Sequence, residues 1–214
     1  MEEVSGSRSQ PGLESDERPV CQRDNSGNRG AACRPVEVLA LLAVLLSTAA
    51  RAQSATEYQV KAAFLFNFAK FVEWPADAFS SPDAPLQICL LGPDPFGPDF
   101  EQLIVDKVVN AHRIEVIHPS GIAQARSCHL LFIALSDRQA LKDVLLGMKG
   151  ASVLTVGDQP GFAKMGGMIN FVLEDNRVRF EINLKAAEQA HLKLSARLLT
   201  VAKLVLNEDN SRGN

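Results

Sequence analysis

Residues 128–156 read Cys128-His-Leu-Leu-Phe-Ile-Ala-Leu-Ser-Asp-Arg-Gln-Ala-Leu-Lys-Asp-Val-Leu-Leu-Gly-Met-Lys-Gly-Ala-Ser-Val-Leu-Thr-Val156. Two apolar runs of strand length, Leu130–Ala134 and Ser152–Val156, enclose a segment with a helical pattern, Asp137–Met148. A side-chain oxygen of Asp137 can cap the start of that helix. A strand, a helix and a second buried strand in this order predict two parallel neighbouring strands joined by a crossover helix.

The same alternation continues on both sides of this unit. Further strands are expected at Leu86–Leu91, Arg113–His118, Met168–Leu173 and Val178–Ile182, and further helices at Tyr58–Val72, Phe100–Lys107 and Leu184–Leu206. The last two strands flank the turn Glu174-Asp-Asn-Arg177. The sequence therefore predicts an α/β fold with a mainly parallel sheet, covered by helices on both faces. A C-terminal antiparallel hairpin at the sheet edge and a long final helix complete it.

The first predicted helix has an unusually wide apolar surface. Thr56 can cap its start and Glu73-Trp74-Pro75 ends it. Phe64, Phe68, Phe71 and Val72 form an apolar stripe at helical spacing, and Phe66 lies outside that stripe. Such a helix is either buried or covered by a partner. Phe66 and Trp74 are the candidate contact residues.

The segment before this helix has the features of an export signal. Arg29 and Arg34 precede the apolar core Val38–Leu46, and the small-x-small triplet Ala50-Arg51-Ala52 follows it. This core is about half the length of a membrane-spanning helix, which needs about 20 apolar residues. Residues 29–52 are thus predicted to be a signal peptide cleaved after Ala52, which places the protein in the periplasm. An uncleaved N-terminal anchor is the alternative.

Composition bounds the rest of the chain. Residues 1–28 are polar, with too little apolar content to fold, and are predicted to be a disordered leader or to follow from a mis-assigned start codon. Residues 53–214 have the size of one α/β domain. Six of the 22 Lys and Arg residues and seven of the 25 Asp and Glu residues precede residue 53, which leaves a formal net charge of −2. With no long basic stripe, the domain is not expected to bind nucleic acid.

Cysteine usage agrees with export. Cys21 and Cys33 precede the cleavage site, so the mature chain keeps only Cys89 and Cys128. Both lie in apolar runs that are predicted to be buried strands. In an oxidising compartment the pair indicates one disulfide, with two buried free thiols as the alternative.

No catalytic or metal-binding set emerges from the sequence. Gly92-Pro-Asp-Pro-Phe-Gly97 lacks the Lys-Ser/Thr of a phosphate-binding loop and reads as a turn. No G-x-S-x-G is present. The four histidines, His112, His118, His129 and His191, do not have the close spacing of metal ligands. We expect no enzyme activity, no metal and no cofactor.

Two features remain as candidate sites. The loop Gly157–Gly167 leads into a strand through a glycine pair, and it could close over a small ligand or be a plain strand-entry turn. Its candidate ligand residues are Phe162, Lys164, Gly166 and Gly167. In the last predicted strand, Arg177, Arg179 and Glu181 share one face. A charged stripe on an edge strand guards against aggregation, and it can also dock a partner.

Several ordered motifs together resemble those of one known family. They are Glu57-Tyr-Gln-Val-Lys-Ala-Ala-Phe-Leu-Phe-Asn-Phe-Ala-Lys-Phe-Val-Glu-Trp-Pro75, Ile88-Cys-Leu-Leu-Gly92 with Asp94-Pro-Phe-Gly97, Cys128-His-Leu-Leu-Phe-Ile133, Gly166-Gly-Met-Ile169, Arg179-Phe-Glu-Ile-Asn183 and Leu198-Leu-x-x-Ala202. The chain is similar in these motifs to the YfiR family of periplasmic regulators. The resemblance covers essentially all of the mature chain.

The resemblance implies a periplasmic α/β protein that represses a membrane diguanylate cyclase through that enzyme's periplasmic domain. It further implies an outer-membrane lipoprotein that can sequester the repressor, and a bridge between Cys89 and Cys128. Apart from the resemblance, a second copy of the chain is kept as a candidate partner in a homodimer. A second cysteine pair of the best-studied family member has no counterpart near Ala163–Asn170, so redox control through a second bridge is not expected. A periplasmic small-molecule sensor is the alternative function.

Overall fold

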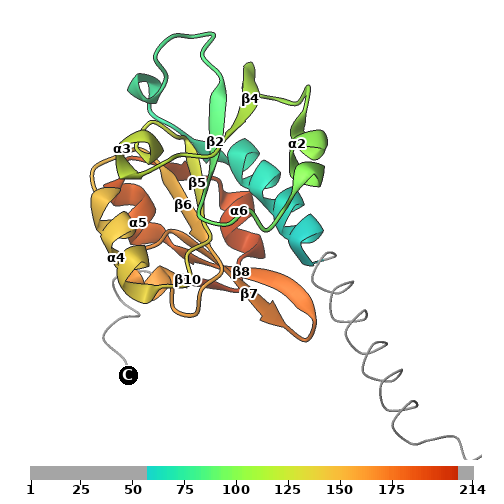
Figure 1. Cartoon of the computed structure of the whole chain (residues 1–214), viewed down its shortest axis with the longest axis vertical. Helices are drawn as coiled ribbons and strands as arrows, with labels where there is room; N and C mark the ends of the chain where they lie inside the picture. Colours follow the sequence, from blue (N-terminus) through green and yellow to red (C-terminus); the bar gives the residue numbers. More distant parts are fainter. Residues whose placement is uncertain (1–56, 207–214) are drawn as a thin grey trace, which may run out of the picture. The chain divides into compact units, whose positions relative to one another are not determined.

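The computed structural model describes residues 57–206 (Figure 1). The predicted leader, the predicted signal peptide and the predicted cap Thr56 lie outside the described residues. The described part begins with a helix over residues 57–71 and ends with a short strand.

The centre of the fold is a mixed sheet in the order β10-β8-β7-β6-β5-β2-β4-β3. Its strands are β2 (Leu86–Leu91), β3 (Val108–Val109), β4 (His112–Ile117), β5 (Leu130–Ile133), β6 (Leu154–Gly157), β7 (Ile169–Glu174), β8 (Arg177–Asn183) and β10 (Leu204–Leu206). From β4 through β2, β5 and β6 to β7 all pairs are parallel. The β7–β8 pair is antiparallel, as is β3–β4, while β10 runs parallel to β8. The predicted fold class is confirmed.

Helices cover both faces of this sheet (Figure 1). They are the helix over residues 57–71, α2 (Pro98–Ile104), α3 (Ile122–Ala125), α4 (Arg138–Gly147), α5 (Leu184–Gln189) and α6 (Ala196–Val201), with short 3-10 turns η1 (Ala76–Ala78) and η2 (Ala163–Met165). The core on one face contains Phe68 of the first helix, Phe100 of α2 and Leu198 of α6. The core on the other face contains Ala125 of α3 and Leu141 of α4.

Local sequence signals placed most elements well. Strand β2 has the predicted bounds, and Gly92–Gly97 forms a turn. Asp137 caps α4, because its side chain accepts a hydrogen bond of 2.6 Å from the amide of Ala140. The first helix ends one residue early, since Val72 enters a second sheet in which β1 (Val72–Glu73) pairs with β9 (Lys193–Leu194).

The prediction of one long final helix over residues 184–206 is wrong. Residues 184–206 form α5, β9, α6 and β10 in turn. The helix breaks at His191, whose backbone is left-handed with a φ of 59°, and restarts at Ser195, whose side chain caps α6. Pairing of Lys193 and Leu194 with β1, together with burial of Leu192, outweighs the helical preference of the local sequence.

The β7–β8 hairpin was predicted to form the edge of the sheet, but only part of β8 is an edge. Strand β10 covers Glu181–Asn183 of β8, and the amide of Lys203 donates a hydrogen bond of 2.8 Å to the carbonyl of Phe180. Within the described residues, only the Arg177 end of β8 lacks a strand on its outer side.

Candidate functional site

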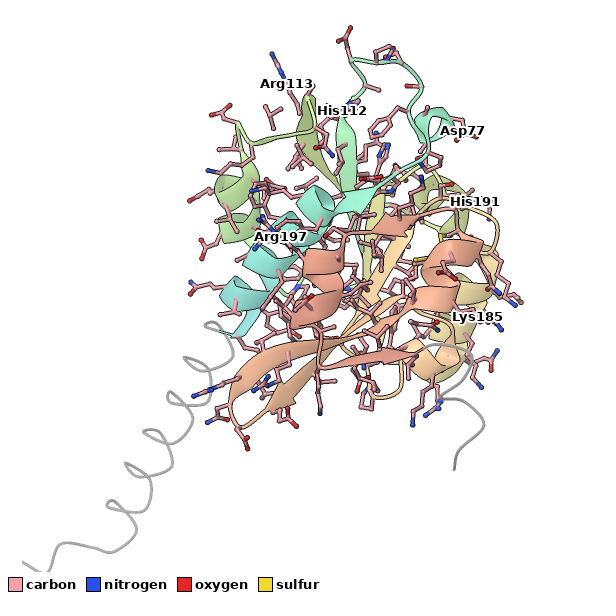
Figure 2. The ribbon with its side chains drawn as sticks, turned by 180° about the vertical axis from the view of Figure 1, so that it is seen from behind. Asp77, His112, Arg113, Lys185, His191 and Arg197 are labelled. Carbon is pink, nitrogen blue, oxygen red and sulfur yellow. A yellow bond between two sulfur atoms is a disulfide. The ribbon has the colours of Figure 1, made fainter. Side chains whose placement is uncertain are left out.

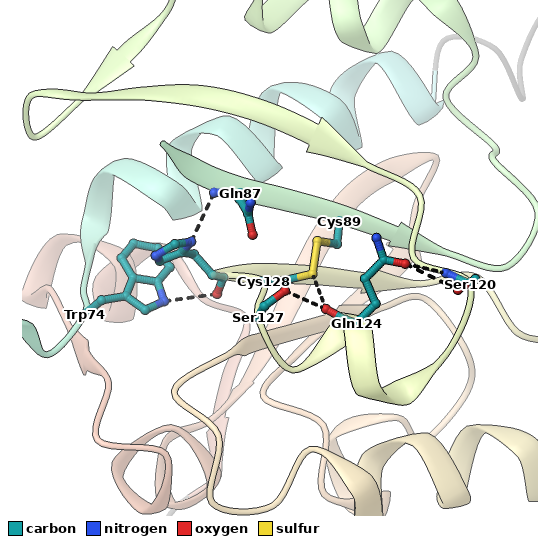
Figure 3. Close-up of a disulfide and its surroundings, with 8 residues drawn as sticks. Trp74, Gln87, Cys89, Ser120, Gln124, Ser127 and Cys128 are labelled. Carbon is teal, nitrogen blue, oxygen red and sulfur yellow. Dashed lines mark hydrogen bonds between the residues drawn. A yellow bond between two sulfur atoms is a disulfide. The ribbon is translucent and has the colours of Figure 1, made fainter. Parts of the chain in front are cut away.

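Cys89 and Cys128 form a disulfide (Figure 3). It joins the middle of β2 to a position two residues before the start of β5. The two Cα atoms are 6.0 Å apart, and both side chains are buried. The bridge predicted from the sequence is therefore confirmed. Next to it, the carbonyl of Gln124 accepts a hydrogen bond of 2.8 Å from the hydroxyl of Ser127.

A stack of aromatic rings lies at the amino ends of these strands. The ring of Phe79 lies between those of His112 and His129, with centroid distances of 3.9 and 4.2 Å. The Trp74 ring meets His129 edge-on at 6.0 Å. The sequence predicted scattered histidines, whereas the fold brings two of the four together, and His118 and His191 are exposed. No spacing in the sequence marks the pair, because its residues come from separate segments.

His129 is held neutral in this stack. The amide of Gln87 donates a hydrogen bond of 3.1 Å to its Nδ1, which leaves the ring proton on Nε2. Burial lowers the pKa of His129 to about 4, against a smaller opposing effect of the Ala78 backbone. Trp74 also binds the main chain of His129, because its Nε1 donates a hydrogen bond to the His129 carbonyl (Figure 3).

The predicted charged stripe on β8 is mostly engaged within the fold. Arg179 pairs with Glu174 at 3.3 Å, and Lys203 pairs with the same carboxylate at 2.9 Å. The hydrogen bond from Lys203 lowers the pKa of Glu174. Glu181 is half-buried and accepts a hydrogen bond of 3.3 Å from Asn170 Nδ2. Only Arg177 is exposed with no described partner, so the stripe offers less free charge than its pattern implies.

The predicted ligand loop divides into a buried and an exposed half. Phe162 is fully buried, and its ring packs against Gly157 and Gly167 so closely that a Cβ on either glycine would collide with it. The glycine at 167 is thus required by packing. Lys164 and Gly166 are exposed and line a cavity.

That cavity, which we call the lysine groove, lies between α4, α5 and η2. It has a volume of about 640 Å³. Four lysines line it, Lys142, Lys149, Lys164 and Lys185, with Leu145, Met148, Met168 and Ala190 among its apolar residues. Figure 2 shows Lys185 on α5.

A second cavity, which we call the aromatic groove, lies between the first helix and α6. Its volume is about 510 Å³, and its lining includes Phe64, Phe68, Phe71, Phe180, Arg197, Leu198 and Val201. The rings of Phe68 and Phe180 meet edge-on at 5.0 Å. Figure 2 shows Arg197 on α6, beside the first helix. Phe66, the predicted contact residue, lies outside this groove beneath Lys70, whose Nζ is 5.5 Å from the ring.

Lys61 is a buried lysine near the carboxyl end of β6, and no pattern in the sequence predicted its burial. Lys61 is only 5% exposed, and its ammonium pairs with Glu57 at 2.6 Å and with Asp158 at 2.8 Å. Burial alone acts to lower the pKa of Lys61, but the hydrogen bonds to Asp158 and Glu57 outweigh it and raise the pKa. Tyr58 donates a hydrogen bond of 3.0 Å to the same Asp158 carboxylate. Lys61 and Tyr58 lie on the first helix and Asp158 directly follows β6, so these contacts hold the helix to the end of that strand.

Among residues 57–206, no group of three or more His, Cys, Asp or Glu side chains could hold a metal ion. The same part contains no helix that is long and apolar enough to cross a membrane.

The motifs at both ends of the domain match one family. The model of the YfiR/HmsC-like family aligns with residues 58–203, from the first helix to the residue before β10. The chain belongs to the YfiR/HmsC-like family. The YfiR/HmsC-like region thus includes the disulfide, the aromatic stack and both grooves.

Solved structures show weaker likenesses. One is a conserved domain protein from Vibrio cholerae O1 biovar eltor str. N16961, with 12% identity and a TM-score of 0.40 over 56% of this chain and 55% of that one. Another is an ABC domain from Streptococcus pneumonia in complex with L-Trp, with 10% identity and a TM-score of 0.41 over the same shares. The chain spans about half the length of each.

Proposed function

We propose that the protein is a periplasmic regulator that represses a membrane-bound diguanylate cyclase by direct contact and so lowers cyclic di-GMP. Membership of the YfiR/HmsC-like family supports a regulatory rather than a catalytic role. The observation that carries the contact is the aromatic groove, an apolar hollow that the described part of the chain leaves uncovered.

The aromatic groove has the composition of a protein contact site. Aromatic residues and arginine are enriched at the centres of interfaces, where they supply most of the binding energy. Phe64 and Phe71 are half-buried at the wall, and Val201 on α6 is 66% exposed. An apolar side chain of the partner that fills the groove would remove this surface from water. Arg197 at the wall favours an acidic residue beside that anchor.

The contact is tested by changing the groove without changing the core. Val201→Asp places a charge on an exposed position of the aromatic groove, so folding should be retained while an apolar partner loses affinity. Val105→Asp is the matched control, because Val105 is 62% exposed and lies outside that groove. Cyclic di-GMP is measured in a deletion strain complemented with each variant.

Deletion should raise cyclic di-GMP. The wild-type chain and Val105→Asp should restore the low level, and Val201→Asp should not. An unchanged cyclic di-GMP level on deletion would refute the repressor function. Full repression by Val201→Asp would remove the aromatic groove as the contact surface.

The charged stripe is a less suitable place for such a test. Reversing Glu181 to Arg would deprive the buried Asn170 side chain of its partner, so that variant combines a surface effect with a folding effect. Arg177→Glu changes the exposed end of the stripe alone. The proposal includes two further partners at the aromatic groove, an outer-membrane lipoprotein and a second copy of this chain in a homodimer. Either partner would compete with the cyclase for the groove.

A further inference from the structure

The lysine groove combines a cationic rim with an apolar floor. Lys142, Lys149 and Lys164 are exposed residues of its lining, and no carboxylate of the described residues pairs with any of them. Among the described residues of the lining, only Asp143 is acidic, and it accepts a hydrogen bond from Gln139. These three exposed lysines against one aspartate give a formal charge of +2 in a chain whose formal net charge is −3.

Apolar side chains lie beneath the lysines of the groove. Leu145, Met148 and Met168 are each less than 8% exposed, and thioether side chains adapt to ligands of different shape. Leu146, at 62% exposed, adds an apolar residue to the lining.

The polar side chains of the floor are already occupied. The hydroxyl of Thr155 accepts a hydrogen bond of 3.1 Å from the amide of Met168. Asn183 donates to the carbonyl of Ala163 at 2.9 Å and accepts from the amide of Ala186 at 3.0 Å. A ligand therefore meets charge at the rim and apolar surface beneath it.

We propose that the lysine groove binds a small anionic amphiphile, with its acidic head on the lysine rim and its apolar body on the floor. The volume of about 640 Å³ suits a small molecule, since ligand sites typically measure about 300–1,000 Å³. A purely polar anion would leave the floor exposed to water, and a neutral apolar molecule would gain nothing from the lysines. This site is separate from the aromatic groove and does not depend on the proposed contact with a cyclase.

Isothermal titration of the purified protein tests the site with three ten-carbon probes, the two ionic ones below their micelle concentrations and the alcohol below its solubility limit. These are decanoate, decanol and decyltrimethylammonium. Decanoate should bind, decanol more weakly, and the cation not at all. Added salt should weaken decanoate binding, because it screens exposed lysines.

Variants then locate the bound probe. Lys142→Gln with Lys164→Gln should weaken decanoate binding about fivefold or more, from the loss of two exposed ion pairs. Lys70→Gln with Lys107→Gln is the matched control, because both lysines lie outside the lysine groove, and its affinity should equal that of the wild type. Leu146→Glu adds a negative charge to the lining and should weaken binding without touching the core.

Three results would overturn the proposal. The first is absence of decanoate binding to the wild-type protein. The second is equal affinity for decanoate and decanol, which would show that the lysines take no part. The third is loss of binding on Val201→Asp with retention in the Lys142 and Lys164 variant, which would place the probe in the aromatic groove.

Discussion

Trp74 Nε1 donates a hydrogen bond of 3.0 Å to the main-chain carbonyl of His129. This bond connects the segment after the first helix to the start of β5, across 55 positions of the chain. Trp74 is half-buried as a result, although its place after an apolar helix predicted a partner contact. Its side chain serves the fold of the chain itself, and its predicted role at an interface remains a prediction.

His129 should make stability depend on pH. The pKa of a histidine in the unfolded chain is about 6.5, and burial lowers that of His129 to about 4 in the folded state. The unfolded chain therefore binds the proton more readily. The stability contributed by the neutral ring is complete above pH 6.5 and is lost as the pH falls from 6.5 toward 4, by about 1.4 kcal/mol per unit and about 3 kcal/mol in total.

Urea denaturation between pH 4 and 7 measures this effect. His129→Gln should show a shallower fall in unfolding free energy over this range, from a lower starting value. His191→Asn is the control, because His191 is exposed and asparagine tolerates its left-handed backbone. Parallel curves for His129→Gln and the wild type would show that another group carries the pH dependence.

Gly157→Ala and Gly167→Ala should each destabilise the protein by about 1–3 kcal/mol, because the new methyl group collides with the buried ring of Phe162. Thermal unfolding measures the loss. Gly121→Ala is the matched control, since a Cβ there meets no atom within 4 Å, and its melting temperature should stay close to that of the wild type. Unchanged stability in both loop variants would contradict the packing of Phe162.

Removing the disulfide should lower the free energy of unfolding by about 4 kcal/mol, as the chain-entropy relation gives for a loop of 39 residues. Cys89→Ala with Cys128→Ala is the variant of choice, because it leaves no free thiol in the core. A reducing agent should destabilise the wild type and leave the double variant unaffected. If mass spectrometry of periplasmic protein finds two free thiols, the bridge does not form in the cell.

Lys61→Met should cost about 3 kcal/mol, because it leaves the carboxylates of Asp158 and Glu57 without their cation. Asp158→Asn in the same chain should recover part of that loss, and a double-mutant cycle gives the coupling energy. Lys107→Met, at an exposed position, should change stability by no more than about 0.5 kcal/mol. A coupling energy near zero would mean that the pair is not formed in solution.

Local patterns in the sequence determined the elements and the class of fold. The apolar runs that became β2 and β5, and the cap at Asp137, depend on residues close together in the chain. Such signals are written in periodicity and turn chemistry, so they can be read without a structure. The Cys89–Cys128 bridge was accessible for a related reason, because only two cysteines follow the predicted cleavage site.

Only the tertiary structure decided which residues face solvent and which meet across the sheet. It split residues 184–206 at His191, because β9 pairs with β1 more than a hundred positions earlier. It buried Phe162 of the predicted ligand loop and stacked His112 and His129 on Phe79. It also formed the two grooves between elements that are distant in sequence. Contacts of this kind leave no local period in the chain, because their energy comes from packing surfaces that folding alone brings together.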